Sequence, residues 1–311
     1  MSTRFNRTAV SLPVFSLIAA MLLWASSFIA LKLAFEIYDP MLVIFGRMLI
    51  ASICFLLVFR KIYHFEYRRS DIKYLLLMAA SEPCLYFLFE AAALENTSAS
   101  QAGMITSLMP LMVAIGAFLV FAERIHRNMM AGFVLAIIGA CLLSVAADVD
   151  SHAPNPLLGN LQEFMAMICG AVYTLCLKHL ATRYSTWLLT AVQAWVGSLF
   201  FLPFLFFPGT ELPDPTLSSG YDLQGICAII YLGTLVNIGA YGMFNYAVSR
   251  IPASQASAYI NLIPVFTLLM AMLVLGESLN LMQWLASVLV FAGVWLSQVK
   301  PAEPEVVAQP L

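Results

Sequence analysis

The sequence has little charge for its length. Of its 311 residues, 10% are charged and 62% are hydrophobic, and the formal net charge at pH 7 is −2. A soluble domain carries roughly 25% charged residues, so this composition excludes an ordinary soluble protein and indicates a chain that lies in a lipid bilayer. A net charge so close to zero supplies no basic field for a polyanion, and we expect no nucleic-acid partner.

The sequence also lacks the motifs of enzymes and of metal sites. It contains no HExxH, GxSxG or Walker motif. None of the six cysteines forms a CxxC pair or a Cys/His ligand spacing, so we interpret them as small core residues. The four histidines fall in loops or at the ends of apolar segments. We therefore expect no enzyme, no cofactor and no metal.

Ten apolar segments are long enough to span a membrane, which takes roughly 20 helical residues. They are predicted at 12–33, 41–59, 73–92, 98–121, 128–147, 160–179, 187–207, 224–247, 254–275 and 280–298. The sequence thus predicts an all-α membrane protein with ten transmembrane helices.

Lysine and arginine are absent from every second loop between these segments. They follow the second, fourth, sixth, eighth and tenth segments and precede the first, whereas the intervening loops carry only acidic charge. Basic loops stay in the cytoplasm, so we predict a multi-pass protein of the cell inner (plasma) membrane with both termini cytoplasmic. The regular alternation supports the count of ten helices, because a missed helix would disrupt it.

A repeat relates the two halves of the sequence. Ala99-Ser100-Gln101-Ala102 recurs as Ala253-Ser254-Gln255-Ala256, and at the same offset Leu108-Met109-Pro110 matches Leu262-Ile263-Pro264. Five helices in each half reverse the direction of the second half, so the repeats are predicted to be inverted. Inverted repeats of a secondary transporter place the binding site near the bilayer midplane, between the halves.

The repeat predicts four units in the chain. They are a first five-helix repeat at 12–147, a linker at 148–159, a second five-helix repeat at 160–298 and a disordered cytoplasmic tail at 299–311. The tail is assigned as disordered because it is polar and rich in proline.

Several of these motifs resemble the EamA-type permeases of the drug/metabolite transporter superfamily. They are Trp24-Ala25-Ser26-Ser27-Phe28 in the first segment, Arg47 early in the second, and the small-residue starts of the fourth and ninth segments, each followed by a proline. The resemblance covers nearly the whole chain. It implies a ten-helix secondary carrier, and it leaves the substrate open because the family moves chemically diverse metabolites and drugs.

Glu82 is the first candidate for a functional residue, because it lies beside Pro83 near the middle of the third segment. A carboxylate there costs on the order of 2.5–3.5 kcal/mol on insertion scales. It either couples transport to protons by taking up and releasing one, or it is a protonated group bonded to a neighbouring helix. Tyr86 and Glu90 follow at i+4 and i+8 on the same broad face. Arg47 either binds a substrate anion or forms a structural ion pair with Glu90, which is the interpretation we favour.

The eighth segment carries a stripe of polar side chains at helical spacing. Such groups either bond between helices or line a cavity, and four of them on one face favour a cavity. The stripe is formed by Thr234, Asn237, Tyr241 and Asn245. Aromatic side chains elsewhere could form the walls for a small organic substrate. The candidates are Trp24, Phe28, Tyr173, Trp195 and Tyr259.

These observations predict a secondary active transporter that exports a small metabolite, such as an amino acid, by alternating access. Two alternatives remain open at this point: an uptake or exchange carrier for a nucleotide-like metabolite on the same fold, and a lipid flippase or membrane-embedded enzyme. The predicted partners are the lipid bilayer, a small-molecule substrate and possible coupling protons. The chain is expected to be a monomer or a homodimer.

Overall fold

The computed structural model describes residues 7–57, 68–121, 127–147, 153–207, 222–251, 256 and 258–299, and these ranges contain helices and no strand. Eight helical segments are long and apolar enough to cross a membrane, and two further apolar segments, Tyr259–Leu275 and Leu281–Ser297, are shorter. All ten lie within a few residues of the predicted segments. The chain is an all-α membrane protein, as the composition indicates.

The helices fall into two sets in chain order. The first set is α1 (Arg7–Phe35), α2 (Pro40–Leu57), α4 (Ile72–Ala79), α5 (Tyr86–Asn96), α6 (Ala99–Ile105), α7 (Met109–Phe121) and α8 (Arg127–Val145). The second set is α9 (Pro156–Leu180), α10 (Thr186–Phe201), α11 (Leu223–Tyr231), α12 (Tyr241–Arg250), α14 (Ile263–Met270) and α15 (Leu281–Gln298). Shorter 3₁₀ or π turns adjoin them: η1 (Arg69–Asp71), η2 (Ala80–Leu85), η3 (Thr106–Leu108), η4 (Leu202–Phe206), η6 (Leu232–Ala240), η7 (Tyr259–Leu262) and η8 (Ala271–Leu275).

The predicted linker is shorter than expected, because part of it is helical. Asn155 caps α9 by accepting a hydrogen bond from the Leu158 amide at 3.3 Å, and Pro156 occupies the first helical position. Proline is favoured there because its missing N–H is not needed. Residues 148–152 of the linker lie outside the described residues, as does the predicted tail from residue 300 onward.

Prolines interrupt three of the long helical segments. The 3₁₀ turns η3 and η7 directly precede the helical starts that contain Pro110 and Pro264. Beside Pro83, Glu82 leaves the helical region with φ −146° and ψ 116°. Proline lacks an amide hydrogen and its ring clashes with the preceding turn, so these breaks follow directly from the sequence.

Large apolar side chains cover the outside of the molecule. Leu57, Phe206 and Leu273 are 81%, 80% and 85% exposed, which suits a surface that contacts lipid tails. Cys141 and Cys227, predicted as core residues, are also exposed. This corrects the prediction, and its physical reason is that an apolar side chain gains little by leaving lipid for the protein interior.

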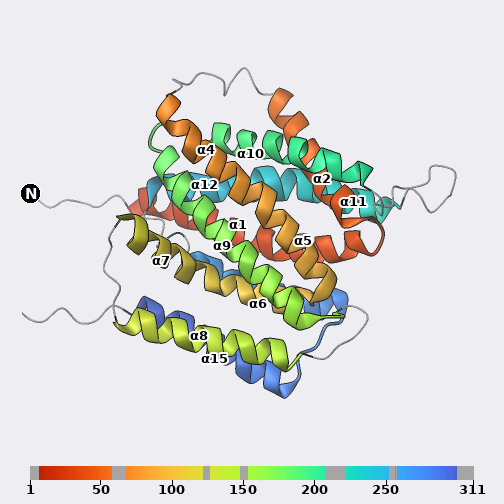
Figure 1. The fold of residues 1–311 in the computed structure, drawn as a ribbon, viewed down its shortest axis with the longest axis vertical. Helices are drawn as coiled ribbons and strands as arrows, with labels where there is room; N and C mark the ends of the chain where they lie inside the picture. The colour runs from red at the N-terminus through yellow and green to blue at the C-terminus, as the bar shows by residue number, and fades with distance from the viewer. Residues whose placement is uncertain are drawn as a thin grey trace, which may run out of the picture.

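The two sets of helices are interleaved rather than side by side. Helix α1 of the first set packs on α12, α14 and η6 of the second, and α9 of the second set packs on α4, α5 and α7 of the first. Helices α8 and α15 lie together along one side of the bundle, and α2 and α10 lie along the opposite side (Figure 1). Any space at the centre is therefore bounded by elements of both sets.

The helix termini gather at two opposite ends of the bundle. At one, called here the Glu277 end, the Asn155 amide donates to the Asn96 carbonyl at 3.1 Å, joining the start of α9 to the end of α5. At the other, called the Asp71 end, the start of α4 contacts Arg183, which follows α9. Helices α5 and α9 therefore run in opposite directions between the same two ends.

Candidate functional site

A small cavity of about 30 Å³ lies between the two sets of helices. One water molecule needs about 10–15 Å³ of such volume, so in this conformation the cavity has room for a few waters and is too small for an amino acid. Residues of α1, α2, η2, α5, η3 and α7 line the cavity from the first set, and residues of α9, η6, α12, η7 and α14 from the second. The sequence-predicted residues that line it are Trp24, Phe28, Arg47, Glu82, Tyr86, Glu90, Tyr173 and Tyr241.

Glu82 joins the two sets of helices through a polar contact. Its side chain is 4% exposed, and its carboxylate is hydrogen-bonded to the hydroxyl of Tyr241 on α12. The Tyr241 ring in turn packs edge-on against Trp24 of α1, with the ring centroids 5.1 Å apart. The interruption beside Pro83 places this carboxylate at a break in the helix, so a chargeable group and a helix break coincide at the cavity.

Arg47 and Glu90 form a buried ion pair beside Glu82. The guanidinium Nη2 lies 3.1 Å from the Glu90 Oε2, and the two side chains are 2% and 5% exposed. The Arg47 guanidinium also lies over the Phe87 ring, 3.6 Å from its centroid. The Asn237 side chain donates to the Arg47 carbonyl oxygen at 3.2 Å. The ion pair that the sequence offered as the alternative to anion binding is present.

Two predicted cavity residues lie elsewhere. Asn245 is fully buried in a network in which it accepts from the Tyr173 hydroxyl at 2.6 Å and donates to Thr190 at 2.8 Å. Tyr259 packs against the hydrophobic core, and its neighbour Ile260 lines the cavity instead. These positions correct the prediction: the helical spacing of Asn245 is right, but α9 and α10 take up its amide, and the turn η7 rotates Tyr259 away.

The remaining members of the predicted stripe are divided among different environments. Thr234 donates to its own helix at the Ile230 carbonyl, 2.7 Å away. Asn237 lines a smaller pocket next to the central cavity, which it shares with Tyr241. Outside this stripe, the aromatic candidate Trp195 of α10 donates at 3.4 Å to the Ser52 carbonyl and lines neither pocket. A single face of one helix thus serves packing, bonding and cavity lining at once.

Glu163 is a buried carboxylate that the sequence prediction missed. It lies on α9, has no exposed surface, and neither of its side-chain oxygens has a hydrogen-bond partner within the described part of the chain. One helical turn further along α9, Met167 lines the central cavity. The signal was present in the sequence, because Glu163 is a lone acidic residue in an apolar segment, which is the property that singled out Glu82.

A polar network joins α9 to the Glu277 end. The Asn160 amide, one turn before Glu163, donates to Gln101 Oε1 at 2.8 Å and to Ser144 Oγ at 2.9 Å, and its oxygen accepts from Thr97 at 2.9 Å. Gln101 also lines a vestibule of about 420 Å³ at this end. Polar side chains therefore lead from the vestibule toward the cavity.

The vestibule is bordered by a loop that follows the ninth predicted segment. Its residue Glu277 accepts hydrogen bonds from the amides of Ala99 and Ser100, both at 2.9 Å, and so binds the start of α6. Gly276, directly before it, has a φ of +68°, which side chains with a Cβ rarely adopt. At the offset of the sequence repeat, Glu277 corresponds to Glu123, which lies outside the described residues.

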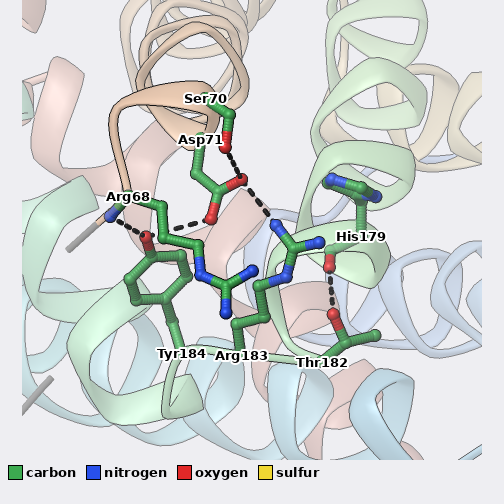
Figure 2. Close-up of polar contacts among 7 residues, drawn as sticks. All are labelled: Arg68, Ser70, Asp71, His179, Thr182, Arg183 and Tyr184. Atoms are coloured by element: carbon green, nitrogen blue, oxygen red, sulfur yellow. Dashed lines mark hydrogen bonds and ion pairs between the residues drawn. The ribbon is translucent and has the colours of Figure 1, made fainter. Parts of the chain in front are cut away.

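The Asp71 end is closed by a polar cluster between the two sets of helices (Figure 2). The Asp71 carboxylate, 1% exposed, accepts from Arg183 at 2.7 Å, from the Tyr184 hydroxyl at 3.1 Å and from Ser70 at 3.3 Å. The Tyr184 hydroxyl also accepts from the Arg68 amide at 3.4 Å. The turn after α9 is thus bound to the start of α4.

A related contact lies at the Glu277 end. There the Tyr38 hydroxyl accepts from the Asp222 amide at 3.1 Å and donates to the Asp222 carbonyl oxygen at 3.3 Å. Tyr38 and Tyr184 each follow the first helix of their set, and Asp71 and Asp222 directly precede α4 and α11. We call these contacts the Tyr38 clasp and the Tyr184 clasp. They join corresponding parts of the two sets at opposite ends.

The fold and the site together define a polytopic helical membrane protein with an interior cavity shared by two interleaved sets of helices. The profile of the EamA-like transporter family matches residues 11–145 and again residues 157–298. The chain belongs to this family. Its EamA-type resemblance, first seen in short motifs, is confirmed over both sets of helices.

Relatives of similar length carry transporter names. An uncharacterized transporter of Archaeoglobus fulgidus is 27% identical, over 90% of this chain and 95% of its own length. A probable amino-acid metabolite efflux pump of Salmonella typhimurium is 26% identical over 91% and 93%. A probable terminal-alkyne amino-acid exporter of Streptantibioticus cattleyicolor is 24% identical over 92% and 93%. The names point to transport of small metabolites rather than to an enzyme.

A solved crystal structure shares the fold. It superposes with a TM-score of 0.65 over 93% of this chain and 96% of its own, at 17% sequence identity. The chain is thus a multi-pass membrane transporter of small metabolites with a fold that recurs in distant sequences.

Proposed function

We propose that this protein exports a small amphiphilic metabolite, such as an amino acid, by alternating access as a secondary active transporter. The observation that carries the proposal is the closed cavity, which residues of both sets of helices line. A site between two sets can be opened to one side and then to the other by moving the sets relative to each other. The names of the Salmonella and Streptantibioticus relatives support an amino-acid-like substrate.

The membrane orientation follows from the distribution of charge. Among the described residues, Arg68, Arg69, Lys73 and Arg183 lie at the Asp71 end, which is therefore the cytoplasmic end under the positive-inside rule. Both termini are then cytoplasmic in the inner membrane, and ten crossings form inverted repeats at 12–147 and 160–298. The interleaved packing of α1 and α9 supports this arrangement.

Residues at the cavity divide into binding and coupling groups. Trp24, Phe28, Tyr86 and Tyr241 supply aromatic surface for the apolar part of a substrate. Glu82 is the coupling residue, because it is a buried carboxylate at a helix break and its hydrogen bond crosses between the two sets. Proton uptake at Glu82 would break or remake that bond, which links protonation to the relative position of the sets.

Purified protein in proteoliposomes tests the proposal. We expect counterflow of at least one radiolabelled amino acid out of a panel of twenty, and faster net export when a pH gradient is imposed. The matched control is Leu273→Ala, a lipid-facing variant, with empty liposomes as the blank. Transport of nucleotide-like metabolites alone, or of none of the amino acids, would overturn the proposed substrate class.

A further inference from the structure

The interior near the cavity contains more carboxylates than cations. Glu82, Glu90 and Glu163 are each no more than 5% exposed, and Arg47 is the cation that contacts this group, through Glu90. Glu82 has the Tyr241 hydroxyl as its partner. Glu163 is therefore the member of the group whose carboxylate is not accounted for by the contacts of the described residues.

The Glu163 carboxylate, which has no hydrogen-bond partner among the described residues, indicates a ligand. Buried polar groups in native proteins are nearly always hydrogen-bonded, and each exception requires an explanation. An uncompensated buried carboxylate costs several kcal/mol, and a neutral carboxyl with no partner still loses the hydrogen bonds that it made to water. A bound proton alone would leave the O–H and the carbonyl oxygen without partners. An ammonium group supplies three donors and one positive charge.

Glu163 is placed where a substrate has to pass. Helix α9, which carries Glu163, packs against α5. Glu90 and Tyr86 of α5 line the cavity and are near enough for the Glu163 charge to act on both, by repulsion between like charges in the case of Glu90. One turn away on α9, Met167 lines the cavity, and one turn in the other direction Asn160 bonds to Gln101 of the vestibule. Glu163 thus lies between the cavity and the Glu277 end.

We propose that Glu163 and Glu90 form a subsite for the ammonium group of an amine-bearing substrate, between the central cavity and the vestibule. An organic ammonium fits better than a metal ion, since among the described residues no three or more His, Cys, Asp or Glu side chains are arranged so that they could hold a metal ion together. The aromatic rings beside Glu90, those of Tyr86 and Phe87, also attract organic cations. The inference rests on the proposed function and names the chemical group that the transporter recognises.

Matched pairs of compounds test the subsite in the full-length protein in nanodiscs. The pairs are L-phenylalanine with 3-phenylpropionate and L-leucine with 4-methylpentanoate, which differ by the amino group. Binding is measured by equilibrium dialysis on wild type, Glu163→Gln, Glu163→Asp and the control Glu95→Gln, whose side chain is exposed. We expect wild type and Glu95→Gln to bind at least one amine ten times more tightly than its partner.

Glu163→Gln is expected to lose this preference, and Glu163→Asp to keep part of it, which separates loss of charge from loss of fold. The inference is overturned if Glu163→Gln retains the preference, or if wild type shows none, as it would if Glu163 bound only a proton. Transport of an amino acid whose rate and binding preference are both unaffected by Glu163→Gln would remove the subsite and leave the proposed function standing. Absence of all transport would remove the function, while the binding preference would still decide the subsite.

Discussion

Arg47 and Glu90 show how strongly one buried side chain depends on another. Their contact is 3.1 Å and almost completely shielded from solvent. Removing one partner of a buried ion pair costs about 3–5 kcal/mol, whereas replacing both with apolar groups is often neutral. We therefore expect Glu90→Leu to lower the free energy of unfolding by an amount in this range. The double variant Arg47→Leu/Glu90→Leu should recover most of the loss in thermal unfolding in detergent, and additive losses would contradict the coupling.

Glu82 allows a direct test of proton coupling. Glutamine keeps a hydrogen-bonding group opposite Tyr241 but cannot take up or release a proton. For this reason we expect Glu82→Gln to lower pH-gradient-driven transport at least tenfold, which corresponds to about 1.4 kcal/mol. Substrate counterflow, which needs no proton gradient, should stay within about threefold of wild type. Proteoliposomes with and without a pH gradient measure both quantities. Wild-type rates with an unchanged pH profile would make Glu82 a structural residue.

Sequence analysis found some site residues and missed others for physical reasons. Glu82 and Arg47 stand out because a charge within an apolar segment has a large insertion cost. Glu163 carries the same signal, but it lies near the start of a predicted segment, where a carboxylate is easily taken for an interfacial group. The position of Asn245 could not be predicted, because periodicity fixes the angle of a residue around its helix and not the neighbouring helix that it meets.

At the scale of elements, the packing of α15 against α8 depends on glycine. A Cβ added to Gly293 of α15 would collide with backbone atoms of Gly132 and Ala136 on α8. One added to Gly239 would only touch Leu23 at 3.7 Å, an ordinary contact. We expect Gly293→Ala to lower stability by about 1–3 kcal/mol, the usual cost of overpacking, and Gly239→Ala to change it little. Thermal unfolding in one detergent compares them, and equal midpoints would contradict this packing.

The positions of the elements were predictable, and most of their partners were not. Apolar length places the spans, and Pro83, Pro110 and Pro264 place the breaks, because both are properties of the local chain. The pairing of α8 with α15, by contrast, joins segments far apart in sequence. The sequence repeat shows that the two halves are related, but it does not show which helices contact each other.

At the scale of the whole molecule, the two clasps predict opposite effects. Tyr184→Phe removes the hydroxyl that binds Asp71, and Tyr38→Phe removes the hydroxyl that binds Asp222 at the other end. With Thr106→Cys as a reporter in the cavity, we expect Tyr184→Phe to raise its labelling by an impermeant maleimide from the Asp71 end. Tyr38→Phe should raise it from the Glu277 end. Increased labelling from the same side in both variants would contradict the prediction that each clasp closes a different end of the cavity.

Cysteine labelling tests the predicted orientation of the molecule in the membrane. Glu36 and Arg69 are exposed at the Glu277 and Asp71 ends. In a background without cysteine, Glu36→Cys should react with an impermeant reagent in intact cells. Arg69→Cys should react only in inside-out vesicles. Reaction of both in intact cells would overturn the inverted ten-helix arrangement.

The clasps also bear on how such a chain arises. Each joins a tyrosine hydroxyl of one set of helices to an aspartate position of the other, through the carboxylate of Asp71 and through the backbone of Asp222. The first set thus holds Tyr38 and Asp71, and the second holds Tyr184 and Asp222. One set therefore contains both halves of the contact. Two identical copies inserted in opposite orientations would each offer a tyrosine to the other's aspartate, as in any self-complementary pair. A single gene of half this length could thus have encoded a dimer, and its duplication and fusion would give the present chain.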